Sequence, residues 1–355
     1  MLKDAYNVIG VMSGTSLDGI DLAHVLLMKN GERWTFELLE CETIPYSADW
    51  VTTLTEAVTQ SPSQLDLMNR SYTKLLAGVI SDFISRHKLA PGVVCSHGHT
   101  VLHRPNEGIT LQIGNRPELA ALLNQVVVCD FRASDVTLGG QGAPLVPIGD
   151  RLLFSDFDYC LNLGGFSNVS FELNDERIAF DISAVNTVLN HYSLKLGFAY
   201  DDNGGLARSG AVSEKLLAEL NALDYYRLSF PKSLGFEFVR EIVLPLIDRH
   251  DLPAAAVLHT FCEHIAIQIG NSLPNKSAKM LVTGGGAYNG FLIGKIKSHL
   301  PQLQIEIPTP KTIEYKEALI FALLGVLRLR NEINVLSSVT GASHDHCSGN
   351  VFYPN

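Results

Sequence analysis

One pattern occurs twice in this chain and limits its fold more than any other feature: a strand, a short polar turn and a second strand. Residues 8–27 read VIGVMSGTSLDGIDLAHVLL, and residues 158–173 read DYCLNLGGFSNVSFEL. Glycine, serine and asparagine in such turns permit positive φ and leave backbone N–H groups facing outward. Two such hairpins, one at the head of each half, predict a duplicated domain with a cleft between the copies.

The segment that joins the two halves is rich in glycine and proline. Residues 130–150 read DFRASDVTLGGQGAPLVPIGD and form the candidate boundary and hinge. We therefore expect an N-terminal domain over residues 1–130 and a C-terminal domain over residues 131–355. Strand-like runs are mixed with helical patterns; residues 61–87, for example, repeat apolar residues at helical spacing after a Ser-Pro start signal. This mixture predicts an α/β protein.

Bulk composition argues against several classes of protein. The 355 residues carry a net charge of -10 without a basic block, which disfavours binding to nucleic acid or to an anionic membrane. We find no basic-then-apolar leader and no apolar run of roughly 18 residues or more, so we expect neither a signal peptide nor a transmembrane helix. The six cysteines are far apart and form no C-x-x-C pair, which favours buried free thiols in a reducing cytoplasm.

Three glycine-rich turns are candidates for binding a nucleotide. The first, around Gly14 to Gly19, offers backbone and hydroxyl donors to phosphate oxygens, and Asp18 in it can hold Mg²⁺ directly or through water. The third, LVTGGGAYNG over residues 281–290, lacks the last glycine of G-x-G-x-x-G, because Asn289 stands there, and the chain contains no P-loop motif. Any nucleotide must therefore bind to hairpin loops. The alternative for each turn is an ordinary structural turn.

Single polar residues suggest catalytic and binding roles, each with a plainer alternative. Asp181 ends the apolar run RIAFD, where a carboxylate can face a cleft and act as a general base, or cap the helix that follows. His97, His99 and His103 could form a zinc site with the His344–Cys347 cluster, but contacts with a polar substrate or plain packing fit their spacing better.

Two charged residues could contact a substrate directly. Arg132, near the hinge, could grip a carboxylate through two hydrogen bonds or form an interdomain salt bridge. Glu317, at the start of the helical pattern YKEALIFALLG, could hydrogen-bond a sugar or favour the helix dipole.

Together these motifs resemble the anhydro-N-acetylmuramic acid kinase family, a branch of the actin/hexokinase/sugar-kinase superfamily. The resemblance covers nearly the whole chain, and its most specific carriers are GVMSGTSLDGID and DFRASDVTLGGQGAPLVP. It implies two ribonuclease-H-like domains, each a mixed sheet flanked by helices, that close over ATP and a sugar in an interdomain cleft. It also implies a bacterial cytoplasmic enzyme that binds ATP and Mg²⁺ and forms a homodimer.

The resemblance assigns roles residue by residue. It implies that the first hairpin loop binds the ATP phosphates through Gly14, Thr15, Ser16, Leu17, Asp18, Gly19, Ile20 and Asp21. Gly164 and Gly165 would form the second phosphate hairpin, and Gly284, Gly285 and Gly286 would lie against the nucleoside. Asp181 would be the catalytic base. Glu317 and His97 would contact the sugar, and Arg132 would bind its lactyl carboxylate.

The reaction that the resemblance implies joins two steps. In 1,6-anhydro-N-acetylmuramic acid, O6 is bonded to C1, so water must open this bridge at C1 while O6 takes the γ-phosphoryl group. The products are N-acetylmuramic acid 6-phosphate and ADP. Asp181 would deprotonate the water, and Mg²⁺ and the loop N–H groups would stabilise the transferring phosphoryl group.

One segment departs from the pattern of the family. The family usually reads Asp-Thr-Gly-Pro-Gly-Asn where residues 181–186 read Asp-Ile-Ser-Ala-Val-Asn. Ile182 and Val185 are β-branched and tolerate positive φ poorly, so we expect the turn to take another path or Asp181 to lie differently. Two other functions stay open on the residues alone: a kinase of the same fold for a different amino sugar, and a non-catalytic protein that binds a nucleotide or a metal.

Overall fold

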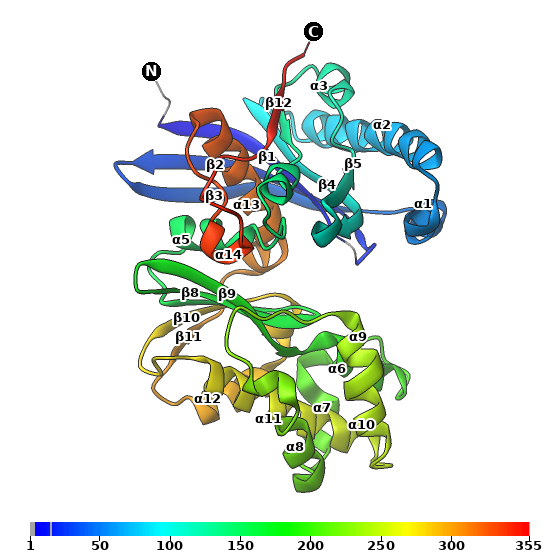
Figure 1. Ribbon diagram of the computed structural model, residues 1–355, viewed down its shortest axis with the longest axis vertical. Coiled ribbons are helices and arrows are strands. Elements are labelled where there is room, and N and C mark those ends of the chain that lie inside the picture. The colour runs from blue at the N-terminus through cyan, green and yellow to red at the C-terminus, as the bar shows by residue number, and fades with distance from the viewer. Residues whose placement is uncertain (1–3, 15, 355) are drawn as a thin grey trace. The chain divides into compact units, whose positions relative to one another are not determined.

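The computed structural model describes residues 4–14 and 16–354, and the chain in it divides into two compact units (Figure 1). Unit 1 comprises Met1–Leu153 and Tyr315–Asn355, and unit 2 comprises Phe154–Glu314. The sequence places the boundary at residue 130 instead. The difference arises because the helices that follow residue 130 and the last 41 residues of the chain (315–355) belong to unit 1.

Unit 1 is built on a mixed seven-stranded sheet. Its strands follow the order β12-β6-β4-β1-β2-β3, with β5 paired to β4. β1 pairs antiparallel with β2 and parallel with β4. The bounds are β1 Ala5–Ser13, β2 Gly19–Asn30, β3 Arg33–Pro45, β4 Val93–Arg104, β5 Ile109–Ile113, β6 Val127–Cys129 and β12 Asn350–Phe352.

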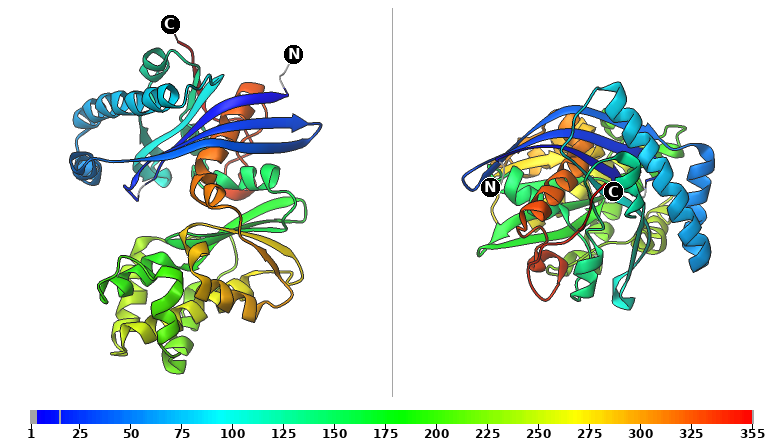
Figure 2. Two further views of the ribbon diagram at one scale, coloured as in Figure 1. Left: turned by 180° about the vertical axis from the view of Figure 1, so that it is seen from behind. Right: turned by 90° about the horizontal axis from the view of Figure 1, so that it is seen from above.

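Helices cover both faces of this sheet, as Figure 2 shows for α2 and α13. α2 (Pro62–Arg86) begins at a capping box formed by Ser61 and Gln64, as the Ser-Pro signal predicts, and buries Tyr72, Leu76 and Ile80 against strands β1 and β4. On the opposite face, α13 (Pro310–Arg330) approaches so closely that a Cβ at Gly10 would lie 1.9 Å from the carbonyl oxygen of Ala318. The remaining helices are α1 Ala48–Glu56, α3 Glu118–Leu123, α4 Ala133–Thr137, α5 Val146–Leu153 and α14 Ser337–Thr340.

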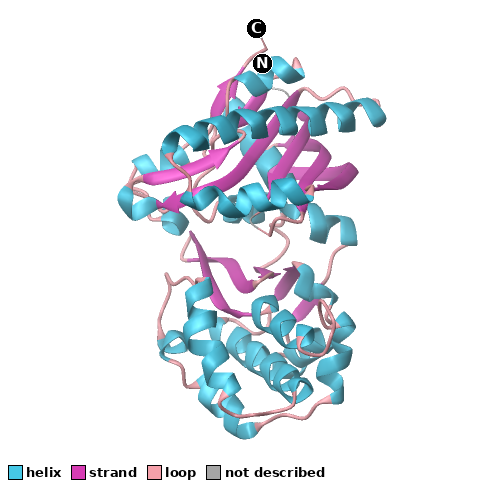
Figure 3. Ribbon diagram, turned by 90° about the vertical axis from the view of Figure 1, so that its right-hand side faces the viewer, coloured by secondary structure: helices cyan, strands magenta, loops and turns pink. Residues whose placement is uncertain are grey.

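Unit 2 is built on a five-stranded sheet in the order β11-β10-β7-β8-β9. Its strands are β7 Tyr159–Leu163, β8 Phe166–Leu173, β9 Glu176–Ala184, β10 Lys279–Thr283 and β11 Gln304–Glu306. The helices gather beside the sheet (Figure 3). They are α6 Asn186–Leu194, α7 Gly205–Ser209, α8 Glu214–Asn221, α9 Phe236–Phe238, α10 Leu244–Asp248, α11 Ala254–Ser272 and α12 Gly290–His299.

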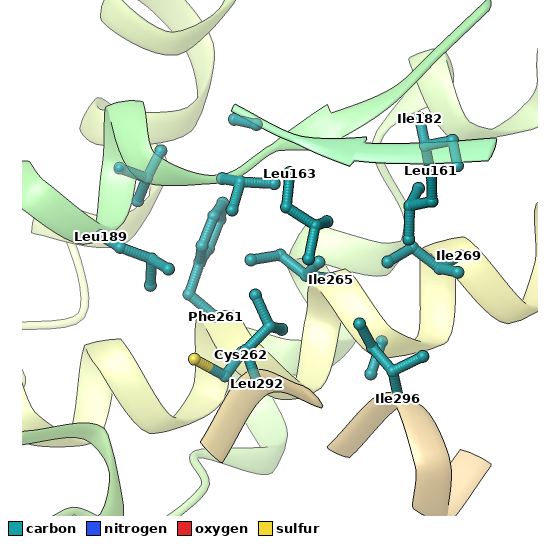
Figure 4. Packing of buried hydrophobic residues seen from close by; sticks show 14 of the residues in the cluster. Leu161, Leu163, Ile182, Leu189, Phe261, Cys262, Ile265, Ile269, Leu292 and Ile296 are labelled. Carbon is teal, nitrogen blue, oxygen red and sulfur yellow. The ribbon is translucent and has the colours of Figure 1, made fainter. Parts of the chain in front are cut away.

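The core of unit 2 lies between one face of its sheet and helices α11 and α12. Figure 4 shows Leu161, Leu163 and Ile182 from the strands packed with Phe261 and Ile265 from α11. All of these side chains are buried. Because successive side chains of a β-strand point to opposite faces, the residues of β7 and β10 that alternate with these core residues lie on the other face of the sheet.

The two sheets repeat one topology. The order β6-β4-β1-β2-β3 in unit 1 matches β11-β10-β7-β8-β9 in unit 2, with three antiparallel strands followed by two parallel ones in both. This confirms the predicted α/β class, the two mixed sheets flanked by helices and the hairpin at the head of each repeat. Among the described residues, no helix has both the length and the apolar character that crossing a membrane requires.

Candidate active site

The first hairpin loop connects β1 and β2 over residues 14–18. Among the described residues of this loop, Leu17 has a positive φ, at 62°, although the sequence offers glycines that permit one. Gly19 has another role, because a Cβ there would lie 2.5 Å from the carbonyl oxygen of Ile44 in β3. Ser16 and Asp18 are exposed, and the Ser16 hydroxyl donates to Asp18 Oδ1 at 2.6 Å. The loop therefore presents a hydroxyl and a carboxylate to solvent.

The other residues assigned to this loop differ in what they can offer a ligand. Ile20 is buried in the core of unit 1, so only its main chain could contact a nucleotide. Asp21 is half-buried in β2, and its Oδ1 accepts a hydrogen bond from the Thr43 hydroxyl at 2.6 Å. Thr15 lies outside the described residues.

A buried cluster of hydroxyls lies directly behind the loop, and sequence reasoning missed it. Ser13, the last residue of β1, places its Oγ 2.6 Å from the Tyr46 hydroxyl and 2.7 Å from the Tyr72 hydroxyl. His99 Nδ1 lies 3.1 Å from the same Oγ. Burial lowers the pKa of His99 to about 4, so its imidazole is neutral at pH 7. The cluster therefore anchors the start of the loop through neutral hydrogen bonds.

Arg132 and His97 are brought together in unit 1. Arg132 Nε donates to His97 Nε2 at 2.8 Å, and Arg132 Nη1 donates to the carbonyl of Gly142 at 2.6 Å. Because His97 Nε2 accepts, its Nδ1 carries the proton and donates to the carbonyl of Gly98. Because Nε already donates to His97, a bidentate interaction with a carboxylate can use only the Nη1–Nη2 end of the guanidinium.

The charges around Arg132 explain its protonation state. Burial lowers the pKa of Arg132 to about 10, while Glu317 opposes the shift, so the guanidinium is charged at pH 7. Glu317 is exposed, although many protein atoms lie around its carboxyl group. This surrounding raises the pKa of the Glu317 carboxyl, and the Arg132 charge opposes the rise. The pKa of His97 is lowered well below its usual value by burial and then by Arg132.

The histidines of the zinc alternative are engaged elsewhere. His103 Nδ1 contacts the Thr110 hydroxyl, whereas His346 faces the buried Asp135 carboxylate at 3.6 Å. Asp135 also accepts from the backbone of Gly142 and from the Thr340 hydroxyl. Within residues 4–14 and 16–354, no three His, Cys, Asp or Glu side chains are arranged to hold a metal ion.

Asp181 lies inside strand β9 of unit 2, whereas the sequence predicts it at the end of a strand. Its Oδ2 accepts from the backbone N–H of Leu234 at 2.8 Å. Its own N–H donates to the carbonyl of Lys232, and its carbonyl accepts from the Tyr225 hydroxyl at 2.6 Å. Burial raises the pKa of the Asp181 carboxyl, and the Leu234 N–H opposes the rise. The other oxygen, Oδ1, is the one available to take a proton.

The alternative role of Asp181, as the cap of the next helix, is wrong. Val185 occupies the N-cap position of α6, and no side chain caps that helix. Val185 has φ of -132°, and Ile182 is a strand residue, so neither β-branched residue takes the positive φ that it tolerates poorly. The segment avoids a flexible turn by extending β9 to Ala184.

A β-bulge makes this extension possible. Asn168 of β8 pairs with Asp181, and the preceding Ser167 pairs with Ser183, so Ile182 is the extra residue. Ser167 and Ser183 are linked through their hydroxyl oxygens at 2.9 Å. The path that this segment takes is a bulged strand.

The second hairpin turn and the TGGG segment are packed against each other. Gly164 and Gly165 form a tight turn, and the backbone N–H groups of residues 185–187 donate to their carbonyls. Gly284 has φ of 80°, and a Cβ there would lie 2.5 Å from Asn162 Oδ1. A Cβ at Gly286 would lie 2.7 Å from Leu163 Cβ. These glycines are required by close packing, while Gly165 and Gly285 are exposed.

These features define a class: two-domain α/β proteins in which one strand topology is duplicated and each copy carries an exposed glycine-rich hairpin turn. The profile of the family described as "Anhydro-N-acetylmuramic acid kinase" matches residues 6–354. The chain belongs to this family.

Relatives of the same description align over nearly the full chain. "Anhydro-N-acetylmuramic acid kinase" from Pseudomonas putida is 36% identical, covering 94% of this chain and 96% of the relative. The protein of that name from Shewanella loihica is 32% identical, covering 98% of both. Among solved structures, component A of the (R)-2-hydroxyglutaryl-CoA dehydratase of Acidaminococcus fermentans covers 92% of this chain and 99% of its own, with 13% identity and a TM-score of 0.47.

Proposed function

We propose that the chain is an ATP-dependent kinase that opens 1,6-anhydro-N-acetylmuramic acid with water and phosphorylates O6. The products are N-acetylmuramic acid 6-phosphate and ADP, which places the enzyme in the recycling of cell-wall sugars. The observation that carries the proposal is membership of the family over residues 6–354. A cytoplasmic location and a homodimer belong to the same proposal, and sedimentation velocity of the purified protein measures the latter.

The residues of unit 2 supply the base in this proposal. Asp181 Oδ1 takes a proton from water as the water oxygen bonds to C1, and the C1–O6 bond breaks as O6 bonds to the γ-phosphorus. The bond between the γ-phosphorus and the oxygen that bridges it to the β-phosphorus breaks at the same centre, and ADP leaves. A carboxyl with a raised pKa takes up a proton more readily than an ordinary Asp, which suits a general base. The Leu234 N–H holds Oδ2 and so fixes the direction of Oδ1.

The residues of unit 1 bind and orient in this proposal. Loop N–H groups over residues 14–21 hold the ATP phosphates, and Arg132 binds the lactyl carboxylate through its Nη1–Nη2 end. His97 orients Arg132, and Glu317 accepts hydrogen bonds from the sugar. The exposed oxygens of Asp18 and Ser16 are of the type that Mg²⁺ prefers, so they fit that ion. When bound, Mg²⁺ would neutralise charge on the phosphates.

Replacing Asp181 by Asn tests the assignment of the base. In a coupled assay of ADP release with the anhydro sugar, D181N should lose at least about 100-fold in kcat, because the amide cannot take the proton of water. ADP affinity and the melting temperature should stay near those of the parent. Asp175→Asn, an exposed acid-to-amide change in the β8–β9 turn, is the matched control and should keep full activity. Unchanged turnover in D181N would remove Asp181 from the mechanism.

The same assay separates the two other candidate functions. Faster phosphorylation of free N-acetylmuramic acid or glucosamine than of the anhydro sugar would indicate a kinase for a different amino sugar. Nucleotide or zinc binding without turnover of any of these sugars would indicate a non-catalytic protein.

The pH profile gives a second test of the base. Asp181 must be deprotonated to act, and its folded pKa is raised, so kcat/KM should fall on acidification at a pH above the ordinary Asp pKa of about 3.9. A flat profile down to that value would contradict the assignment.

A further inference from the structure

Four polar residues form a row across the sheet of unit 2. Thr283 at the end of β10 pairs with Asn162 of β7, and Asn162 pairs with Asn168 of β8. Asn168 in turn pairs with Asp181 of β9. Residues that pair directly across strands place their side chains on the same face. The row therefore runs from the TGGG segment to the proposed base over three strand spacings, or about 14 Å.

This row lies on the face of the sheet opposite the core of unit 2. The paired residues one step back, Val282, Leu161 and Val169, are all members of that core. Side chains alternate between faces along a strand, so the row points away from α11 and α12. Figure 4 shows the core side of the same strands, with Leu161 and Leu163 pointing toward α11.

The side chains of the row have hydrogen-bonding groups without partners. The Thr283 Oγ1 is buried, with the residue 1% exposed, and it has no partner among the described residues. Within the same part of the chain, the amides of the half-buried Asn162 and the exposed Asn168 make no side-chain hydrogen bond. A buried hydroxyl that folding leaves unpaired costs free energy unless a ligand or water completes it.

We propose that Thr283, Asn162 and Asn168 are ligand-contacting residues of this kinase, an inference that rests on the proposed function. The Thr283 hydroxyl and the Asn162 amide donate hydrogen bonds to the nucleotide phosphates beside the exposed Gly165 and Gly285. Asn168 lies directly opposite Asp181, with Cβ atoms about 5 Å apart. Its amide positions the water or the sugar against Asp181 Oδ1. Neutral donors of this kind bind oxygen atoms without disturbing the charge of the base.

Thr283→Val tests the nucleotide end of the row, because it removes the hydroxyl and keeps the shape of the side chain. Titration calorimetry with ADP alone should show an affinity about 3- to 10-fold weaker than that of the parent. The melting temperature should not fall, since the folded protein loses no hydrogen bond. The matched control is Thr260→Val: Thr260 is equally buried, but its hydroxyl donates to the Ala256 carbonyl and accepts from the Ser213 N–H. T260V should lower the melting temperature and leave ADP affinity unchanged.

Asn168→Ala tests the sugar end. With the anhydro sugar, kcat should fall about 10-fold or more, with the ADP affinity that calorimetry measures unchanged. Asn174→Gly, at the far turn of the same hairpin, should match the parent.

The outcomes distinguish a failure of the proposed ligand contacts from a failure of the proposed function. In one outcome, the parent protein turns over the anhydro sugar while T283V keeps the parent's ADP affinity and N168A keeps its kcat. That result overturns the proposed ligand contacts of the row and leaves the proposed function standing. A parent protein that neither binds ADP nor turns over the sugar overturns both.

Discussion

The two hairpin turns occupy equivalent places in the duplicated topology, yet they are fixed in different ways. The first turn, residues 14–18, is exposed and is anchored from behind by side chains that meet at Ser13. The second, Gly164–Gly165, is held by backbone hydrogen bonds from residues 185–187 and by the close approach of Gly284. We therefore expect the protein to lose stability when a hydroxyl group is removed behind the first turn. At the second turn, we expect it to lose stability when a side-chain atom is added to a packed glycine.

The largest effect on stability is expected at Gly284. Gly284→Ala adds a Cβ at φ of 80° and within 2.5 Å of Asn162 Oδ1, so both backbone strain and a clash oppose folding. The free energy of unfolding should fall by about 2–4 kcal/mol, measured by urea denaturation. The matched control is Gly197→Ala in the same unit, where φ is 85° but a Cβ would meet nothing within 4 Å. If both variants lose the same stability, packing against the second turn is not what fixes it.

The first turn should lose its anchor in Ser13→Ala. The change removes the Oγ that contacts Tyr46, Tyr72 and His99. His99 Nδ1 then loses its hydrogen-bond partner among the described residues, while the Tyr46 and Tyr72 hydroxyls still contact each other at 2.6 Å. We expect a loss of about 1–3 kcal/mol in unfolding free energy and a higher KM for ATP. Parent-like values of both would show that the cluster does not support the loop.

The His99 contact also predicts how stability depends on pH. The folded pKa of His99, about 4, lies below its unfolded value near 6.5, so the unfolded chain binds the extra proton between these values. Stability is complete above the unfolded pKa and falls as the pH drops toward the folded one, by up to about 2 kcal/mol from pH 7 to pH 5. His99→Gln should reduce this loss in parallel urea titrations at the two pH values. An identical loss in parent and variant would contradict the buried, neutral state of His99.

The smallest effect on stability belongs to the exposed part of the first turn. Ser16→Ala removes only the surface contact with Asp18, so the free energy of unfolding should change by less than about 0.5 kcal/mol. Because Ser16 belongs to the proposed phosphate loop, the KM for ATP should still rise a few-fold. A fall in stability as large as that of S13A would mean that the exposed loop, and not the buried cluster, carries the anchoring.

The sequence predicts the hairpins and the α/β class because both depend on local composition and on repeated patterns. It cannot reveal the Ser13 cluster, since Tyr46, Tyr72 and His99 lie 33, 59 and 86 positions away along the chain. It identifies Asp181 as a candidate base but places it at the end of a strand, because the bulge at Ile182 follows from pairing with β8 and has no local signal. The return of residues 315–355 to unit 1 likewise depends on tertiary packing at Gly10.

The bulge at Ile182 has a consequence for how this protein can change over time. Phe180, Ile182 and Ala184 all belong to the core, so the inward-facing set of β9 continues past the bulge, while Asp181 pairs with Asn168. A point substitution near the carboxylate alters one side chain and leaves the strand pairing in place. Losing or gaining one codon between Phe180 and Ser183 would instead exchange inside for outside along the rest of the strand. In this short stretch the number of residues therefore matters for the strand pairing, beside the identity of Asp181.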